Sequence, residues 1–434
     1  MSSSSVRDRL APILEKDAAI ILLTLFPIYV VFAAVGTILG YPIGGMVNLI
    51  QRVTFLTAVY ALVVLALNLQ WGLAGLFNIG IAGFMAVGAY AMAILTAPPG
   101  ASPGGFGLPL AVGIAGGLVV AAVLGLITAL PALRLRADYL AITTVAISEI
   151  VRLGLNSQAA VPYTGGASGM SDYTQPTVIT DGLFLRNPNQ VGSEPTALGE
   201  TVFTFFENTF NIYSSATILG IAYVVFLIFV VVLVYLLIAR LVKSPFGRVL
   251  KGIREDEEAT QSLGKDTRLF KIKTFMVGCA LMGLAGMLWM GSEPPVNPAR
   301  FRPVLTFYIF IALIIGGAGS NTGSVIGGAV FANVLFFLPT LLENVVNTLF
   351  SLQASPNNSV EAFGPLLSGQ VEPLLGYIIG NIPPLRFVLI GVLLILLIQR
   401  RPDGILGHRT ETASSVSLTA STRPSRSDGG EDDE

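Results

Sequence analysis

The chain has 434 residues, of which 53% are hydrophobic and only 12% charged, with a mean hydropathy of +0.74 and a formal net charge of −1. A soluble chain carries about a quarter charged residues, so this one is too apolar to cover itself with polar surface. The even charge balance argues against nucleic-acid binding, and a single Cys and a single His exclude a disulfide framework and a multi-histidine metal site. The composition predicts an integral membrane protein.

Ten apolar runs follow one another along the chain, and most approach the roughly 20 residues that a helix needs to cross the hydrocarbon core. They are 18–39, 53–70, 76–97, 108–131, 139–155, 215–239, 273–291, 304–319, 322–345 and 384–398. The run 139–155 is short and carries Glu149 and Arg152, so it is either a span or a re-entrant segment. We predict an all-α polytopic membrane protein with about ten transmembrane helices.

Most Lys and Arg residues fall in segments that such a bundle places on one side, above all between Arg240 and Lys273. By the positive-inside rule this side is the cytoplasm, and both termini lie there. The expected parts are a cytoplasmic N-terminal segment (1–17), a transmembrane domain (18–407) with outer loops at 156–214 and 346–383 and a cytoplasmic loop at 240–272, and a disordered acidic tail (408–434).

Motifs for enzyme chemistry are missing from the sequence. The phosphate-binding pattern G-x-x-x-x-G-K-[ST] does not occur, and H-E-x-x-H is impossible with one His. No paired carboxylates lie within a predicted span. We therefore expect no enzyme activity, no catalytic residues, no metal site and no cofactor bound by this chain.

Gly-rich breaks interrupt the apolar runs once in each half of the chain, at 66–92 and at 316–329. Irregular backbone at membrane depth is tolerated only where it is buried in protein or lines a wet cavity. Paired breaks of this kind indicate a transport site between two structural repeats. The alternative is close helix packing through small residues, with the amides of Asn68, Gln70 and Asn78 bonding between helices.

Other polar groups within the predicted spans add to these candidates. Glu149 and Arg152 are three residues apart, so they can meet on one helix face and neutralise each other, which favours a structural role over one in the path. The candidate path residues are Asn68, Gly72, Gly75, Asn78, Gly80, Thr143, Glu149, Gly316, Gly317 and Gly319.

The cytoplasmic stretch 244–273 carries charges of both signs around an apolar strip of Val249, Leu250 and Ile253. Gly264 is a natural helix stop. The pattern predicts a short amphipathic helix that docks on a cytoplasmic protein. A solvated positive-inside loop is the alternative, but such a loop needs no apolar strip, and the consecutive acids at 255–258 contribute little to orientation.

Several motifs occur in a specific order along most of the chain. They are Asn68 through Ala89, Ala132 through Thr144 with Glu149 and Arg152, Thr164 through Met170, Ser244 through Gly264, Gly316 through Gly328, and Arg401 through Gly407. This ordered set resembles the permease subunits of ABC importers for branched-chain amino acids, a family that also contains urea and short-chain amide permeases. The chain is similar to the longer of the two paired permeases.

The resemblance implies a cell-membrane importer with a second homologous permease subunit, two ATPase subunits that bind the ATP, and an extracytoplasmic substrate-binding protein. It also implies that 246–264 is the coupling helix that fits a groove of the ATPase. The residues expected to couple are Arg248, Arg254, Glu255, Asp256, Glu257, Ala259 and Gly264. The rival interpretation is a secondary transporter or channel that works alone, with Glu149 as its only candidate coupling carboxylate.

Overall fold

The computed structural model describes residues 3–132, 137–188, 190, 192–350, 356, 358–368, 370–380, 382–401 and 403–406. The predicted acidic tail at 408–434 lies outside these residues. Across the described part the protein is helical, with isolated bridges at Met170–Val296 and Leu185–Pro195 in place of strands, so the all-α prediction is confirmed there.

The helices, in chain order, are α1 (Ser3–Ile38), α2 (Ile43–Leu67), the π-helical turn η1 (Asn68–Gly72), α3 (Ile81–Thr96), α4 (Leu110–Ala132), α5 (Ala137–Leu155), α6 (Val161–Thr164), α7 (Val178–Phe184), α8 (Ala197–Phe210), α9 (Ser215–Lys243), α10 (Pro245–Glu255), α11 (Glu257–Ser262), α12 (Thr267–Met290), η2 (Pro298–Phe301), α13 (Pro303–Gly316), α14 (Asn321–Ala329), η3 (Val330–Phe337), α15 (Leu338–Phe350), α16 (Ser359–Phe363), η4 (Gly364–Ser368), α17 (Glu372–Gly380) and α18 (Ile382–Arg400).

Among the described residues, six helical stretches are long and apolar enough to cross a membrane. They are Glu15–Ile38, Ile43–Gly72, Leu110–Ala132, Ser215–Lys243, Thr267–Met290 and Asn321–Val346. Three shorter apolar helices, Ile81–Thr96, Pro303–Gly316 and Ile390–Arg400, coincide with three more of the predicted runs. The remaining run forms α5, so every predicted run contains helix, while the count of ten spans stays a prediction.

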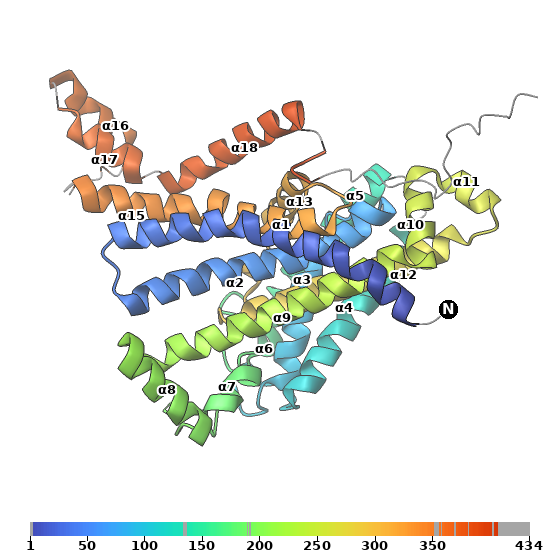
Figure 1. Ribbon diagram of the computed structural model, residues 1–434, viewed down its shortest axis with the longest axis horizontal. Coiled ribbons are helices and arrows are strands. Elements are labelled where there is room, and N and C mark those ends of the chain that lie inside the picture. Colours follow the sequence, from blue (N-terminus) through green and yellow to red (C-terminus); the bar gives the residue numbers. More distant parts are fainter. Residues whose placement is uncertain are drawn as a thin grey trace, which may run out of the picture.

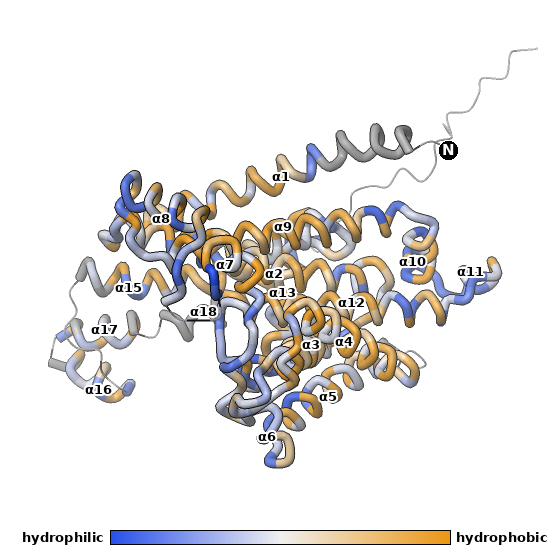
Figure 2. Tube along the Cα trace, turned by 90° about the horizontal axis from the view of Figure 1, so that it is seen from below, coloured by the Kyte–Doolittle hydropathy of each residue, from blue (hydrophilic) through white to orange (hydrophobic). Residues whose placement is uncertain are grey.

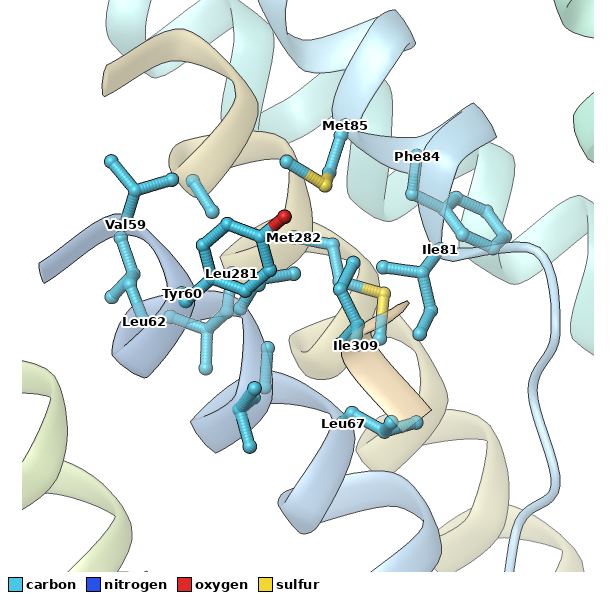
Figure 3. Packing of buried hydrophobic residues seen from close by; sticks show 14 of the residues in the cluster. Val59, Tyr60, Leu62, Leu67, Ile81, Phe84, Met85, Leu281, Met282 and Ile309 are labelled. Atoms are coloured by element: carbon cyan, nitrogen blue, oxygen red, sulfur yellow. The ribbon is translucent and has the colours of Figure 1, made fainter. Parts of the chain in front are cut away.

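Helix α2 is the centre of the bundle. It contacts α1, α9, α12, α13 and α14. Of the most apolar 18 residues in the stretch Ile43–Gly72, 94% are buried. Figure 1 shows α1, α2, α9 and α12 running along the long axis, with α10 and α11 at the end where α1 begins and α8 at the other end. In Figure 3, Val59 and Leu62 of α2 lie in one cluster with Met85 of α3, Met282 of α12 and Ile309 of α13.

The predicted outer segment 156–214 is not only loop, because it contains α6, α7 and α8. It is bonded to the end of α12 and to the stretch that follows α12. The Tyr173 hydroxyl donates to the carbonyl of Met290 at 2.8 Å, and the N–H of Met170 donates to the carbonyl of Val296 at 2.9 Å. These bonds hold the segment against the end of α12 that lies away from α10.

Small residues allow the helices around α2 to approach closely. In lipid no hydrophobic force drives helix against helix, so packing depends on such contacts and on interhelical hydrogen bonds. A Cβ added at Gly88 of α3 would lie 2.4 Å from the Cα of Gly283 in α12. A Cβ added at Gly316 would lie 2.0 Å from the carbonyl oxygen of Gly323, which brings the end of α13 against the start of α14.

We expect Gly88→Val to destabilise the bundle by about 1–3 kcal/mol, because α3 and α12 must separate to admit the side chain. The measurement is thermal unfolding of the purified chain in detergent. Gly154→Ala in α5 is the control, since nothing lies within 4 Å of a Cβ added there. Equal melting temperatures for the two variants would contradict the packing described here.

Candidate functional site

The first Gly-rich break is a non-helical passage through the middle of the protein. Helix α2 continues into the π-helical turn η1, the backbone leaves helical geometry from 75 to 80, and α3 begins at Ile81. The run 76–97 therefore becomes helical later than its hydropathy predicts. Gly75 has φ +69°, a left-handed conformation that favours glycine.

The side-chain amides of Gln70 and Asn78 form hydrogen bonds within this non-helical passage and to α12. Both side chains are fully buried. Gln70 donates to the carbonyl of Phe275 in α12 at 2.9 Å, and Asn78 donates to Gln70 Oε1 at 2.8 Å. Asn78 Oδ1 in turn accepts from the backbone N–H of Gly80 at 2.8 Å. These amides use their hydrogen-bonding capacity inside the chain, as the interhelical-bonding interpretation expects.

Asn68 joins the first break to the second. Its side chain is fully buried, its Oδ1 accepts from the backbone N–H of Gly319 at 2.7 Å, and its Nδ2 donates to Asn321 Oδ1 at 3.0 Å. The two breaks therefore lie against each other although more than 240 residues separate them in the sequence. A Cβ added at Gly72 would lie 2.5 Å from the nitrogen of Gly319, so this approach requires glycine.

The second break lies between α13 and α14 and also receives the end of the described chain. Gly317 and Gly319 have φ values of +104° and +89°. Ser320 begins α14 by accepting from the backbone N–H of Gly323 at 3.0 Å. The N–H of Leu406 donates to the carbonyl of Gly316 at 3.0 Å. The described end of the chain is thus hydrogen-bonded to the second break.

The charged stretch after α9 forms two helices where the sequence predicts one. In α10, Leu250 and Ile253 are buried, as the apolar strip predicts. Asp256 then adopts an extended conformation and caps α11, its Oδ1 accepting from the N–H of Ala259 at 2.9 Å. The cap ends one helix and starts the next, so the expected helix 246–264 is divided at Asp256.

The side chains of this stretch separate into inward and outward groups. Glu257 bonds Lys271 at 2.6 Å and Thr267 at 3.0 Å, which ties α11 to the start of α12. The candidates Arg248, Glu255, Ala259 and Gly264 are exposed, and Gly264 has φ +75°. Leu263, at the tip, is 79% exposed. We name α10, α11 and the linker to α12, residues 244–266, the coupling segment.

Arg254 connects the coupling segment to both breaks. Its Nη1 donates to the carbonyl of Gly72 at 2.7 Å, while its Nη2 donates to Glu255 Oε1 at 2.6 Å. A Cβ added at Gly75 would lie 3.4 Å from Arg254 Cγ, and one added at Gly319 would lie 3.3 Å from Nη1. The guanidinium therefore lies where the first break, the second break and the end of α10 meet.

Candidate residues on α5 are placed apart from this junction. Thr143 donates to the carbonyl of Tyr139 in its own helix. Its neighbour Thr144, which sequence reasoning missed, is fully buried and accepts from the N–H of Ile79 in the first break at 2.9 Å. Glu149 and Arg152 pair with each other, with Arg152 Nε donating to Glu149 Oε2 at 2.9 Å.

Three further polar groups, Thr306, Asp17 and Tyr235, were missed because they lie outside both glycine stretches in the sequence. Thr306 in α13 accepts from the N–H of Ala82 at 3.1 Å. Asp17 in the first half of α1 is buried and accepts from Tyr235 in α9 at 2.8 Å. The Tyr235 and Thr322 hydroxyls are 3.0 Å apart, so this chain of bonds joins α1 and α9 to α14.

The fold and this junction define a class of protein: a multi-pass helical membrane protein with paired helix breaks and a charged segment that is bonded to the first break and lies close to the second. A family model described as branched-chain amino acid transport system / permease component matches residues 49–398. The chain belongs to this family, which is one of transport permeases and not of enzymes.

Curated relatives carry the same description. The chain is 34% identical over 267 residues to the high-affinity branched-chain amino acid transport system permease protein LivM of Escherichia coli, covering 61% of this chain and 58% of that protein. It is 25% identical over 391 residues to a probable branched-chain amino acid transport permease protein LivM of Methanocaldococcus jannaschii, covering 84% and 94%. The match thus spans less than two thirds of the Escherichia coli relative. No solved structure matches the chain.

We expect Asn68→Ala to destabilise the protein by about 1–3 kcal/mol, because it leaves the buried N–H of Gly319 and the amide oxygen of Asn321 without this partner. Thr143→Ala, which removes only a bond within α5, is expected to change stability by less than about 0.5 kcal/mol. Thermal unfolding in detergent compares them. A Thr143→Ala effect as large as that of Asn68→Ala would contradict this assignment.

Proposed function

We propose that the chain is the permease subunit of an ABC importer that moves branched-chain amino acids into the cell. The observation that carries the proposal is the junction at Arg254, where an exposed charged segment is bonded to the first helix break of a permease-family fold and lies against the second. The proposed topology has ten spans in two repeats, with both termini and the coupling segment in the cytoplasm.

The energy source in this proposal is outside the chain. The sequence carries no G-x-x-x-x-G-K-[ST] motif, so ATP is bound by two partner ATPase subunits. A second homologous permease completes the membrane part, and an extracytoplasmic binding protein delivers the solute. The exposed face of the coupling segment, with Glu255, Glu258 and Leu263, is the proposed ATPase contact.

The transport step proposed is alternating access driven from the coupling segment. When the ATPases close on ATP, they displace α10 and α11. Because Arg254 holds the carbonyl of Gly72 and lies against Gly319, that displacement moves both breaks together. Broken helices are suited to this movement, since their backbone bonds can rearrange without unwinding a whole span. Selectivity lies mainly in the binding protein.

The alternative of a stand-alone secondary transporter has less support. Such a transporter needs an intramembrane carboxylate that exchanges a proton or binds a cation. The carboxylate that the sequence offers, Glu149, is paired with Arg152, and both side chains are partly exposed. For the substrate, we expect valine and isoleucine, but not urea or acetamide, to compete with the uptake of labelled leucine.

We expect Leu263→Asp to prevent copurification of the ATPase subunits with the tagged permease, because it places a charge at the exposed apolar tip of the proposed contact. Val360→Asp is the matched control, since Val360 is also 79% exposed but lies in α16. Both variants should be recovered in equal amounts from the membrane. Full ATPase recovery with Leu263→Asp would exclude this contact.

Arg254→Gln is expected to reduce ATP-dependent uptake in proteoliposomes by at least about tenfold while the ATPases still copurify, because it removes the charge-assisted bond to Gly72. Arg254→Lys retains the charge and one donor, so it should recover part of the uptake. Unchanged uptake by Arg254→Gln in an intact complex would contradict transmission through this residue.

A further inference from the structure

A groove of about 600 Å³ opens on the surface between α9 and α12, beside the start of α10. Its lining is Leu237, Arg240, Leu241, Ser244, Phe246, Lys273, Met276 and Val277. Five of these side chains are apolar. The hydroxyl of Ser244 is already engaged, since it donates to the carbonyl of Leu241 at 2.6 Å. The groove is therefore suited to a hydrocarbon chain.

Two cations flank this apolar surface. Arg240 lies in the last turn of α9 and Lys273 in the second turn of α12, and both are exposed. Within the described part of the chain, neither takes part in an ion pair with a carboxylate. A hydrophobic trough beside two uncompensated positive charges is complementary to an acyl chain that carries an anionic headgroup.

The position of the groove in the fold matches that of such a lipid. Helices α9 and α12 belong to stretches long and apolar enough to cross a membrane, and the groove lies where both leave it toward α10. Figure 2 shows α9 and α12 as mostly hydrophobic, with hydrophilic residues at the ends that adjoin α10 and α11. Cations there are at headgroup depth while the apolar lining extends into the hydrocarbon.

We propose that this groove binds one anionic phospholipid, with its phosphate between Arg240 and Lys273 and one acyl chain along Met276 and Val277. The bound lipid braces the base of the coupling segment, because Phe246 lines the groove and stacks on Phe270 at 4.9 Å between ring centres. The inference rests on the proposed function only for placing this end of the bundle at the cytoplasmic face.

The test is native mass spectrometry of the purified full chain titrated with phosphatidylglycerol or phosphatidylcholine. The wild type should retain one phosphatidylglycerol in several-fold preference to phosphatidylcholine. The double variant Arg240→Gln and Lys273→Gln should lose about tenfold in phosphatidylglycerol retention. Val277→Trp, which keeps both cations but fills the groove, should also lose retention.

The control variant is Lys16→Gln with Arg400→Gln, which removes one exposed cation near the start of the apolar stretch of α1 and another from the last turn of α18. It should retain the lipid as the wild type does. Equal loss in the control, equal retention of both lipids, or full displacement by inorganic phosphate would overturn the proposal. So would a Val277→Cys cross-link to the second permease in the assembled complex. The lipid titration uses the isolated chain, so its outcome is independent of ATP-driven uptake.

Discussion

A backbone group that leaves helical geometry inside a membrane has to find its hydrogen-bond partner within the protein, because lipid offers none. In this protein the two breaks meet that requirement largely through each other and through neighbouring hydroxyls. Thr144 and Thr306 accept from N–H groups at Ile79 and Ala82, and Asn68 accepts from Gly319. The bundle around α2 is assembled so that these donors and acceptors meet.

The same requirement explains why the coupling segment is attached where it is. The carbonyl of Gly72 is bonded by Arg254, a residue that reaches it from outside the apolar bundle. An interaction that satisfies the break is thereby also a mechanical connection to the segment proposed to contact the ATPases. A movement of α10 cannot leave the first break unchanged unless this bond is broken, and Gly319 lies close enough to be moved with it.

The sequence indicated the helices and the regions around the two breaks, but it did not show which groups bond to one another within those regions. Hydropathy located all six described helices that are long and apolar enough to cross a membrane, and the glycine-rich stretches located both breaks. The sequence could not show whether Thr143 or Thr144 contacts the first break, because one helical step of about 100° decides which hydroxyl faces it. The contact between Asn68 and Gly319 and the bond from Arg254 to Gly72 join distant parts of the chain, so no local pattern encodes them. The division of the coupling segment at Asp256 depends on a helix N-cap. In the sequence, Asp256 is one of several consecutive acidic residues, so its capping role does not stand out.

In the proposed mechanism, Arg254 makes the coupling segment and the two breaks move as one unit. Hydrogen–deuterium exchange of the assembled transporter, with and without ATP, on peptides covering 68–80 and 316–323 tests this coupling. We expect an ATP-dependent change of exchange in both peptides, and loss of both changes in Arg254→Gln while the change in the coupling segment remains. ATP-dependent changes that persist in both peptides of Arg254→Gln would contradict it.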